Sequence, residues 1–221
     1  LCSTPYEENE KAFIEQLDFL EAVGASRINV CELTRCLFAE ECSMFGDNKP
    51  IATDEEWDKL CDGLNKLGKI AADRGFKLCF HHHMATVVQT LEETKRLMDN
   101  TDPRYVYLCF DTGHFTFSKE DAVKAAKEFG PRIGHVHLKD IRPDMMEKAY
   151  AEGFKFRKAV LEGCFTIPGD GCVDYPGVFK ALHDAHYEGW FIVEAEQDPA
   201  KANPLEYAKM AREYIKKTAG I

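Results

Sequence analysis

The sequence lacks the features that mark several large classes of protein. Its apolar runs fall well short of the about 20 residues that a membrane-spanning helix needs. No cluster of Lys or Arg forms the basic patch typical of a nucleic-acid-binding protein, and the formal net charge is −10. Neither G-x-G-x-x-G nor G-x-x-x-x-G-K-S/T occurs, which argues against a nucleotide-binding fold. We therefore expect no membrane and no nucleic acid among the partners of this protein.

Cysteine occurs nine times, but no C-x-x-C pair is present. Cys31, Cys79 and Cys109 lie in apolar runs, where a free thiol behaves as a small hydrophobic side chain. No signal peptide is visible either. The cysteine pattern therefore indicates reduced thiols and a cytoplasmic protein.

The chain shows a regular alternation of strand and helix patterns. Strands are predicted for the β-rich runs 27–33, 76–80, 105–110, 132–138 and 190–196. Helices are predicted for 54–74, 89–99, 119–129 and 175–187, and a last helix opens with Asn203-Pro204-Leu205-Glu206. This alternation favours a parallel sheet, open or closed into a barrel. No low-complexity linker interrupts it, so residues 1–221 are expected to form a single domain.

Four of the predicted strands end in a side chain that can bind a metal. These side chains are His81, Asp111, His137 and Glu194. Ligands of parallel α/β folds bind at the carboxyl ends of the strands, where these side chains would meet. Two imidazoles and two carboxylates suit a divalent ion, with manganese, cobalt, iron, magnesium and zinc all open by ligand type. A single histidine at a strand end is more often structural, and D-T-G-H could be only an Asx turn. Four such endings together favour the metal site.

The two-residue period of a strand assigns faces to the neighbouring polar residues. Within FHHHMATVVQT, His81 and His83 should share one face and His82 should point the other way. We expect His81 to face the metal, His83 the substrate or a proton path, and His82 the supporting structure. By the same parity Glu194 and Glu196 share a face, with Ile192 packed beneath them. On the predicted strand 132–138, His135 and His137 share a face, and Lys139 follows on the same face.

Five segments together resemble a known family. They are FHHHMATVVQT, CFDTGHFTF, RIGHVHLKDIRP, FTIPGDGCVDYPGVFKAL and GWFIVEAEQDPAKANPLEYA. They resemble the inosose dehydratases, which belong to the xylose isomerase-like, sugar phosphate isomerase/epimerase TIM barrels. The resemblance implies a TIM (β/α)8-type barrel and dehydration of scyllo-inosose (2-keto-myo-inositol) to a trihydroxycyclohexane-1,2-dione. It also implies a divalent cofactor, Mn²⁺ or Co²⁺, and an association with glutathione.

The resemblance places Asp111, His137 and Glu194 on metal-ligand positions of the superfamily. The remaining ligand is usually a glutamate, whereas this chain has His81 there, with His83 or Glu32 as the reserve. Substrate contacts are implied for His114 and Arg142, and we add His135 and Glu32 as substrate-binding candidates.

The resemblance implies more strands than the sequence supplies. Five strands are clear, with a possible stub at Leu1–Ser3, whereas a closed barrel of this type has eight. We therefore expect a barrel that lacks its N-terminal strands in this chain, with a gap where two strands should be. The segment 143–173 is long enough to fold over a site at the strand ends.

Dehydration beside a ketone needs a Lewis acid, a base for the α-proton and an acid for the leaving hydroxide. Glu194, Glu196 and Lys139 are candidates for the base, and His83 or His114 for the acid. One alternative is a metal-dependent ketose epimerase or isomerase, and another is a catalytically silent sugar-binding barrel. A repair endonuclease is a third, disfavoured because the sequence shows no basic groove. The expected partner is a small polyol ketone, and homo-oligomer formation stays open.

Overall fold

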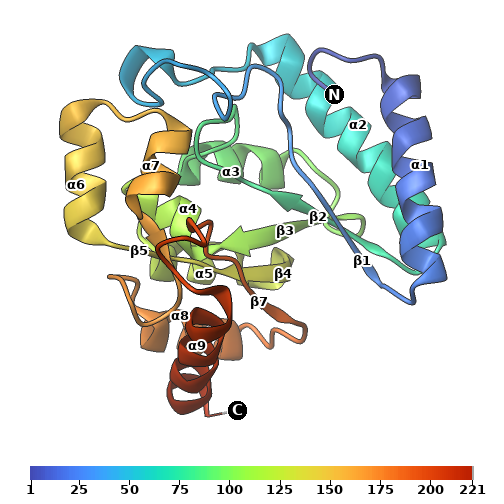
Figure 1. Ribbon diagram of the computed structural model, residues 1–221. Coiled ribbons are helices and arrows are strands. Elements are labelled where there is room, and N and C mark those ends of the chain that lie inside the picture. Colours follow the sequence, from blue (N-terminus) through green and yellow to red (C-terminus); the bar gives the residue numbers. More distant parts are fainter. Residues whose placement is uncertain (221) are drawn as a thin grey trace.

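The computed structural model describes residues 1–220 (Figure 1). Its main sheet has five parallel strands in the order β1-β2-β3-β4-β7. The strands are β1 (Arg27–Val30), β2 (Lys77–His81), β3 (Val106–Asp111), β4 (Ile133–Leu138) and β7 (Phe191–Val193). All five predicted strands are therefore confirmed, and they are parallel as expected. A short antiparallel pair, β5 (Asp140–Ile141) with β6 (Phe165–Thr166), was not predicted.

Helices cover the outer face of the sheet and the carboxyl ends of its strands (Figure 1). The order along the chain is α1 (Tyr6–Ala22), η1 (Gly46–Asn48), α2 (Asp54–Asp73), α3 (Leu91–Asp99), α4 (Thr112–Phe117), α5 (Ala122–Phe129), η2 (Gly130–Arg132), α6 (Pro143–Glu152), α7 (Phe156–Glu162), α8 (Tyr175–Asp184) and α9 (Pro204–Ala219). The predicted start of α2 is confirmed by a capping box, in which the Thr53 side chain accepts from the N–H of Glu56 and the Glu56 carboxylate accepts from the N–H of Thr53. Asn203 caps α9 and Pro204 occupies its first turn, also as predicted.

The possible strand at Leu1–Ser3 does not form. The Leu1 side chain packs against Gly63 of α2, and the N–H of Cys2 bonds to the Glu32 carboxylate rather than to a neighbouring strand. Helix α1 follows instead, and it was not predicted. It buries only Phe13 and Leu17, so its apolar signal in the sequence is weak.

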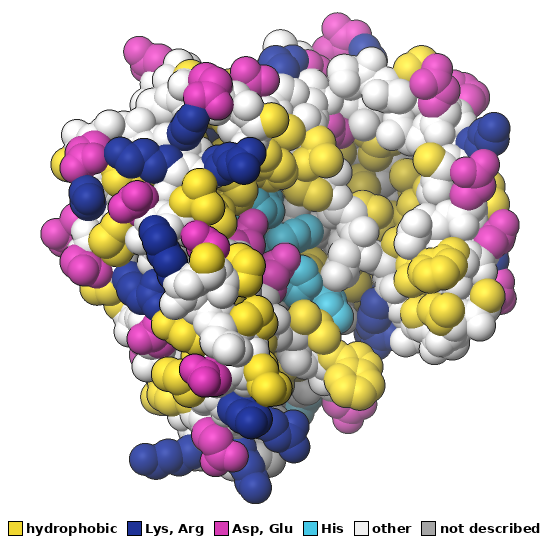
Figure 2. Space-filling model, viewed as in Figure 1, with side chains coloured by type: hydrophobic (Ala, Val, Ile, Leu, Met, Phe, Trp, Pro, Cys, Tyr) yellow, Lys and Arg dark blue, Asp and Glu magenta, His cyan; other side chains and the backbone are white. Residues whose placement is uncertain are grey.

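The sheet is an open part of a barrel. Within residues 1–220, β1 and β7 each pair with one strand only, so both are edges. Side chains on the outer face, such as Leu78, Leu108 and Val136, are fully buried. The inner face is hollowed, and Figure 2 shows histidines at the floor of the hollow. Ile192 was expected to pack beneath Glu194, but 40% of it is exposed because β7 lies at the open edge.

A second apolar cluster lies beyond the carboxyl ends of the strands. It joins the loop after β1 to α6 and α7, with Leu37, Met44 and Phe154 among its buried members. The N–H of Met44 donates to the carbonyl of Phe154, which ties the two segments together. Segment 143–173 thus folds at this end of the sheet, as its length suggested. No helix among residues 1–220 is both long enough and apolar enough to cross a membrane.

Candidate functional site

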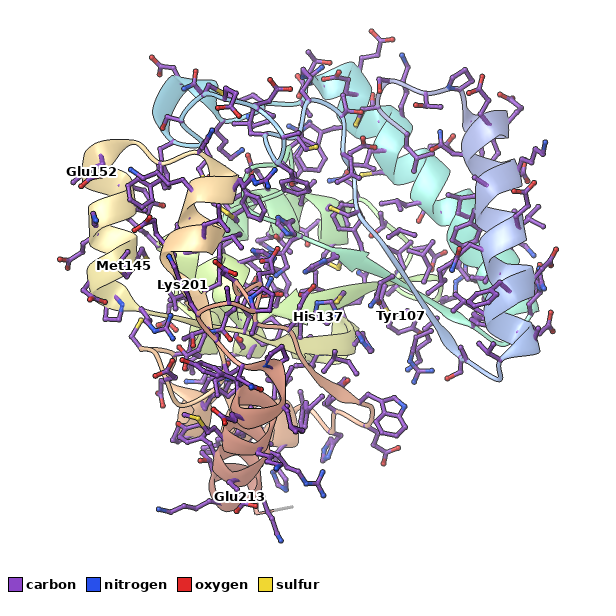
Figure 3. The ribbon with its side chains drawn as sticks, viewed as in Figure 1. Tyr107, His137, Met145, Glu152, Lys201 and Glu213 are labelled. Atoms are coloured by element: carbon purple, nitrogen blue, oxygen red, sulfur yellow. The ribbon has the colours of Figure 1, made fainter. Side chains whose placement is uncertain are left out.

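Four strands bring the expected metal-binding side chains to one place. His81 ends β2, Asp111 ends β3, His137 lies near the end of β4, and Glu194 follows β7. One ligand atom from each lies within 4.8 Å of the others. The register explains the convergence, because Asp111 pairs with His137 and His81 pairs with the residue two before Asp111. Figure 3 shows His137 near the centre of the molecule.

Asp111 is the centre of this cluster and is fully buried. Its Oδ1 accepts from the N–H of His114 at 2.9 Å and so caps α4. Its Oδ2 lies 3.4 Å from His81 Nε2, 3.6 Å from His137 Nδ1 and 3.7 Å from Lys139 Nζ. Burial alone would raise the pKa of Asp111, but His114, Lys139 and the other imidazoles hold it well below its usual range. The carboxylate is therefore ionised and surrounded by cation-binding groups.

His137 and Glu194 present the atoms that best fit an ion. His137 Nδ1 and Glu194 Oε2 lie 2.9 Å apart, but they are not aligned as a hydrogen bond, and both atoms are buried without a hydrogen-bond partner. Burial opposes charge on His137, yet Asp111, Cys109 and Glu194 raise its pKa to about 12. Burial likewise opposes the Glu194 carboxylate, but His137 and Lys139 lower its pKa to about 2. The protonated His137 ring thus lies between the carboxylates of Asp111 and Glu194, and a divalent ion that displaced its proton would find a ring nitrogen and two carboxylates as ligands.

The three consecutive histidines point in different directions. The His82 ring stacks on Phe115 of α4 with centroids 3.7 Å apart, and its Nε2 accepts from the N–H of Asp111 at 3.2 Å. His83 lies on the other side, 3.5 Å from the His114 ring, and its Nδ1 is 2.7 Å from the Met84 carbonyl. That contact places a hydrogen on Nδ1 and leaves Nε2 with its lone pair. The expected alternation holds, although β2 already ends at His81.

We predict that His82→Ala lowers stability by about 1–3 kcal/mol, because it leaves the buried N–H of Asp111 without an acceptor. The same change should weaken metal binding about 10–100-fold, since Asp111 loses its support. Urea unfolding and a metal titration measure the two effects. Unchanged stability in His82→Ala would show that this hydrogen bond does not hold Asp111.

Lys139 crosses the site as a fully buried ammonium group. Its Nζ donates to Glu196 Oε2 at 2.5 Å, contacts His114 Nε2 at 2.9 Å, and lies 3.3 Å from Glu194 Oε2. Burial opposes its charge, but Asp111, Glu196 and Glu194 raise the pKa of Lys139. Burial raises the pKa of Glu196 in turn. His83, His114 and Glu196 are also close enough to share an ion. The Lys139 ammonium group already contacts His114 and Glu196, so it takes the place of a second cation there.

Residues of the D-T-G-H motif at 111–114 contact Lys139 and hold it in place. Thr112 Oγ1 accepts from the N–H of Lys139 and donates to its carbonyl, at 3.0 and 2.7 Å. A Cβ at Gly113 would lie 2.5 Å from Lys139 Cγ, so only glycine leaves room for the stem. His114 then meets the ammonium group. The sequence suggested an Asx turn or a ligand here, and it missed this role of Thr112 and Gly113.

Glu196 reaches the site by an unexpected route. Strand β7 ends at Val193, so strand parity does not apply to Glu196. Its φ is +42°, a value that costs a non-glycine residue energy and that often marks functional sites. This turn in the chain, rather than the pleat, brings Glu196 beside Lys139.

Three other candidates lie outside the four-residue cluster. His135 is buried one layer beneath His137, with ring centroids 5.3 Å apart. Arg142 donates to Gly163, Thr166 and Asp170, which holds the 163–170 loop. Glu32 accepts from the N–H groups of Cys2 and Thr34 and belongs to none of the candidate metal clusters.

The buried histidines should make the metal-free protein sensitive to acid. Burial lowers the pKa of His83 to about 3 and that of His135 to about 4, and it holds those of His82 and His114 well below the usual range. Below about pH 6.5 the unfolded chain binds protons that these four folded imidazoles refuse. The raised pKa of His137 acts in the opposite direction but involves one group against four, so stability is lost as the pH falls. Each group contributes up to about 1.4 kcal/mol per pH unit.

Urea unfolding in EDTA at pH 7.5, 6 and 5 measures this slope. His135→Asn should reduce it by the contribution of one histidine. A free energy of unfolding that stays constant between pH 7.5 and 5 would show that these imidazoles titrate normally in the folded protein.

Comparison with known proteins defines the class of this chain. Residues 1–218 match the family model of the xylose isomerase-like TIM barrels. The solved structure of the IolI protein with a bound zinc atom superposes with a TM-score of 0.69 at 18% identity, over 95% of this chain and 68% of that one. A D-allulose 3-epimerase from Methylomonas in complex with D-allulose gives 0.67 at 21%, over 98% and 72%. The five parallel strands are thus part of a xylose isomerase-like barrel.

The more similar sequences identify the family within that class. Inosose dehydratases of Clostridium perfringens and of Geobacillus thermodenitrificans are each 50% identical over all 221 residues, which cover 74% of each relative. The chain belongs to the inosose dehydratase family and is accordingly a hydro-lyase. Its inosose dehydratase relatives imply a sugar-like small-molecule substrate.

Proposed function

We propose that this protein eliminates water from scyllo-inosose to give a trihydroxycyclohexane-1,2-dione, with one divalent metal ion, Mn²⁺ or Co²⁺. The observation that carries the proposal is the convergence of His81, Asp111, His137 and Glu194 from four strands, in a chain 50% identical to inosose dehydratases. The bound ion would supply the Lewis acidity that stabilises an enolate beside the ketone.

The side chains around that position can move the protons. Glu196 is the base that takes the α-proton, because its raised pKa makes its carboxylate a better proton acceptor than Glu194. Lys139 hydrogen-bonds both Glu196 and His114, and its ammonium group donates a proton to the departing hydroxide, which leaves as water. The proton on Glu196 then returns to Lys139 along their 2.5 Å hydrogen bond. Neutral His83, with its lone pair on Nε2, accepts a hydrogen bond from a substrate hydroxyl.

Further parts of the proposal concern the molecule as a whole. Residues 1–221 form one domain, which a single cooperative unfolding transition would support. All nine cysteines are free, which supports a reducing, cytoplasmic setting. Analytical ultracentrifugation would determine whether the protein forms a homo-oligomer. Arg142 has the indirect role of holding segment 163–170 beside the site.

The decisive assay incubates the protein with scyllo-inosose and follows water loss by mass spectrometry and diketone formation by absorbance. Parallel reactions contain Mn²⁺, Co²⁺ or EDTA, each with and without glutathione. Product formed only with metal supports the proposal. An isomer of unchanged mass would instead identify a ketose epimerase, a reaction that the same donor set could also support. Metal-dependent sugar binding with no product would identify a silent binding protein.

A further inference from the structure

Two aromatic side chains border the candidate site from separate segments. Phe38 belongs to the loop after β1 and Phe156 begins α7, and their ring centroids lie 5.0 Å apart. Each ring is next to His83, at 4.6 Å and 5.7 Å between centroids. Both phenylalanines are only half-buried, whereas Phe154 and Phe165 of the same apolar cluster are fully buried. Hydrophobic side chains accordingly adjoin the histidines in Figure 2.

The loop after β1 is anchored without these rings. Leu37 and Met44 are buried, and their N–H groups donate to the carbonyls of Ala85 and Phe154. Phe45, from the same loop, packs on Tyr150 at 4.0 Å. The anchoring of the loop therefore leaves Phe38 half-exposed, with its ring next to His83.

The site thus has two chemically different sides. One side is polar and consists of the four candidate metal ligands together with Lys139 and Glu196. On the other side are the rings of Phe38 and Phe156. Small-molecule sites commonly combine an apolar wall with a few polar groups that fix orientation.

We infer that Phe38 and Phe156 form an apolar subsite for the C–H face of a cyclitol ring whose hydroxyls are all equatorial. This inference rests on the proposed function. Such a ring carries its hydroxyls around the rim, where they can reach polar side chains, and exposes only axial C–H bonds on its two faces. An axial hydroxyl turned toward the phenylalanines would lose its hydrogen bonds to water and find no partner. The pair therefore selects the stereochemistry of the substrate.

Binding of unreactive cyclitols tests this subsite without turnover. We compare scyllo-inositol, with only equatorial hydroxyls, and chiro-inositol, which has one axial hydroxyl on each face. The Mn²⁺-loaded wild-type protein should bind scyllo-inositol about 10–100-fold more tightly, the range expected when an apolar pocket rejects a hydroxyl. Calorimetric titration gives both dissociation constants. Phe38→Ala and Phe156→Ala should each reduce the ratio of the two dissociation constants at least several-fold. Phe38→Tyr, which keeps an aromatic ring, should retain the wild-type ratio.

Phe45→Ala is the matched control, because Phe45 is a phenylalanine of the same loop that packs on Tyr150 rather than on His83. It should leave the ratio of the two dissociation constants unchanged. Two single variants guard against a folding defect, and circular dichroism checks each of them. A wild-type ratio in folded Phe38→Ala and Phe156→Ala, or no preference in the wild-type protein, would overturn the subsite. Failure of the proposed function has a different signature, namely absence of water loss from scyllo-inosose whatever the inositols do.

Discussion

Asp111→Asn should abolish metal binding and reduce dehydration about 10³-fold or more, since Lewis-acid stabilisation contributes several kcal/mol to the transition state. The substitution removes the charge from the centre of the cluster, where Asp111 Oδ2 faces His81, His137 and Lys139. It keeps an oxygen for the cap of α4, because asparagine caps helices as well as aspartate does. Metal content after dialysis and the rate of diketone formation measure the two losses.

Asp121→Asn is the matched control for this change. Asp121 caps α5 through the N–H groups of Val123 and Lys124, outside the site. Its variant should retain metal and full activity, with a similar melting temperature. If Asp111→Asn keeps stoichiometric metal, the ion does not bind at Asp111.

Lys139→Met should have the largest effect on stability, about 3–5 kcal/mol in the metal-free protein. It removes the buried ammonium group that Asp111, Glu194 and Glu196 share and leaves these carboxylates uncompensated. Activity should fall about 10²–10⁴-fold, because Lys139 is the proposed proton donor. A divalent ion compensates part of the same charge, so Mn²⁺ should raise the melting temperature of this variant more than that of the wild type.

Lys180→Met provides the comparison, since Lys180 pairs with Asp184 on the exposed surface of α8. An exposed pair of this kind contributes little, so the expected change is within about 1 kcal/mol. Equal stability of Lys139→Met and Lys180→Met would mean that the buried carboxylates do not need the ammonium group.

The sequence predicted those parts of the site that lie on regular strands. His81, Asp111 and His137 lie at or next to the ends of strands with a clear apolar pattern, and the two-residue period then determines the face on which each lies. Glu194 follows the last strand directly, so its position was predictable in the same way. The gap in the barrel was predictable too, because the number of strand patterns was too small for closure.

Other parts depend on local geometry or on contacts distant in sequence. Helix α4 has six residues, too few for a helical period to be visible, so the packing of Gly113 against Lys139 was hidden. The position of Glu196 depends on its positive φ, which no pattern in the sequence predicts. Phe38 and Phe156 lie more than 100 positions apart in the sequence and meet only because the loop after β1 packs on α7.

The most direct test of the account is the anomalous diffraction of crystals grown with Mn²⁺. The account predicts one strong manganese peak per chain, in contact with Asp111, His137, Glu194 and His81. A peak elsewhere on the molecule, or no peak from protein that still dehydrates scyllo-inosose in EDTA, would contradict it.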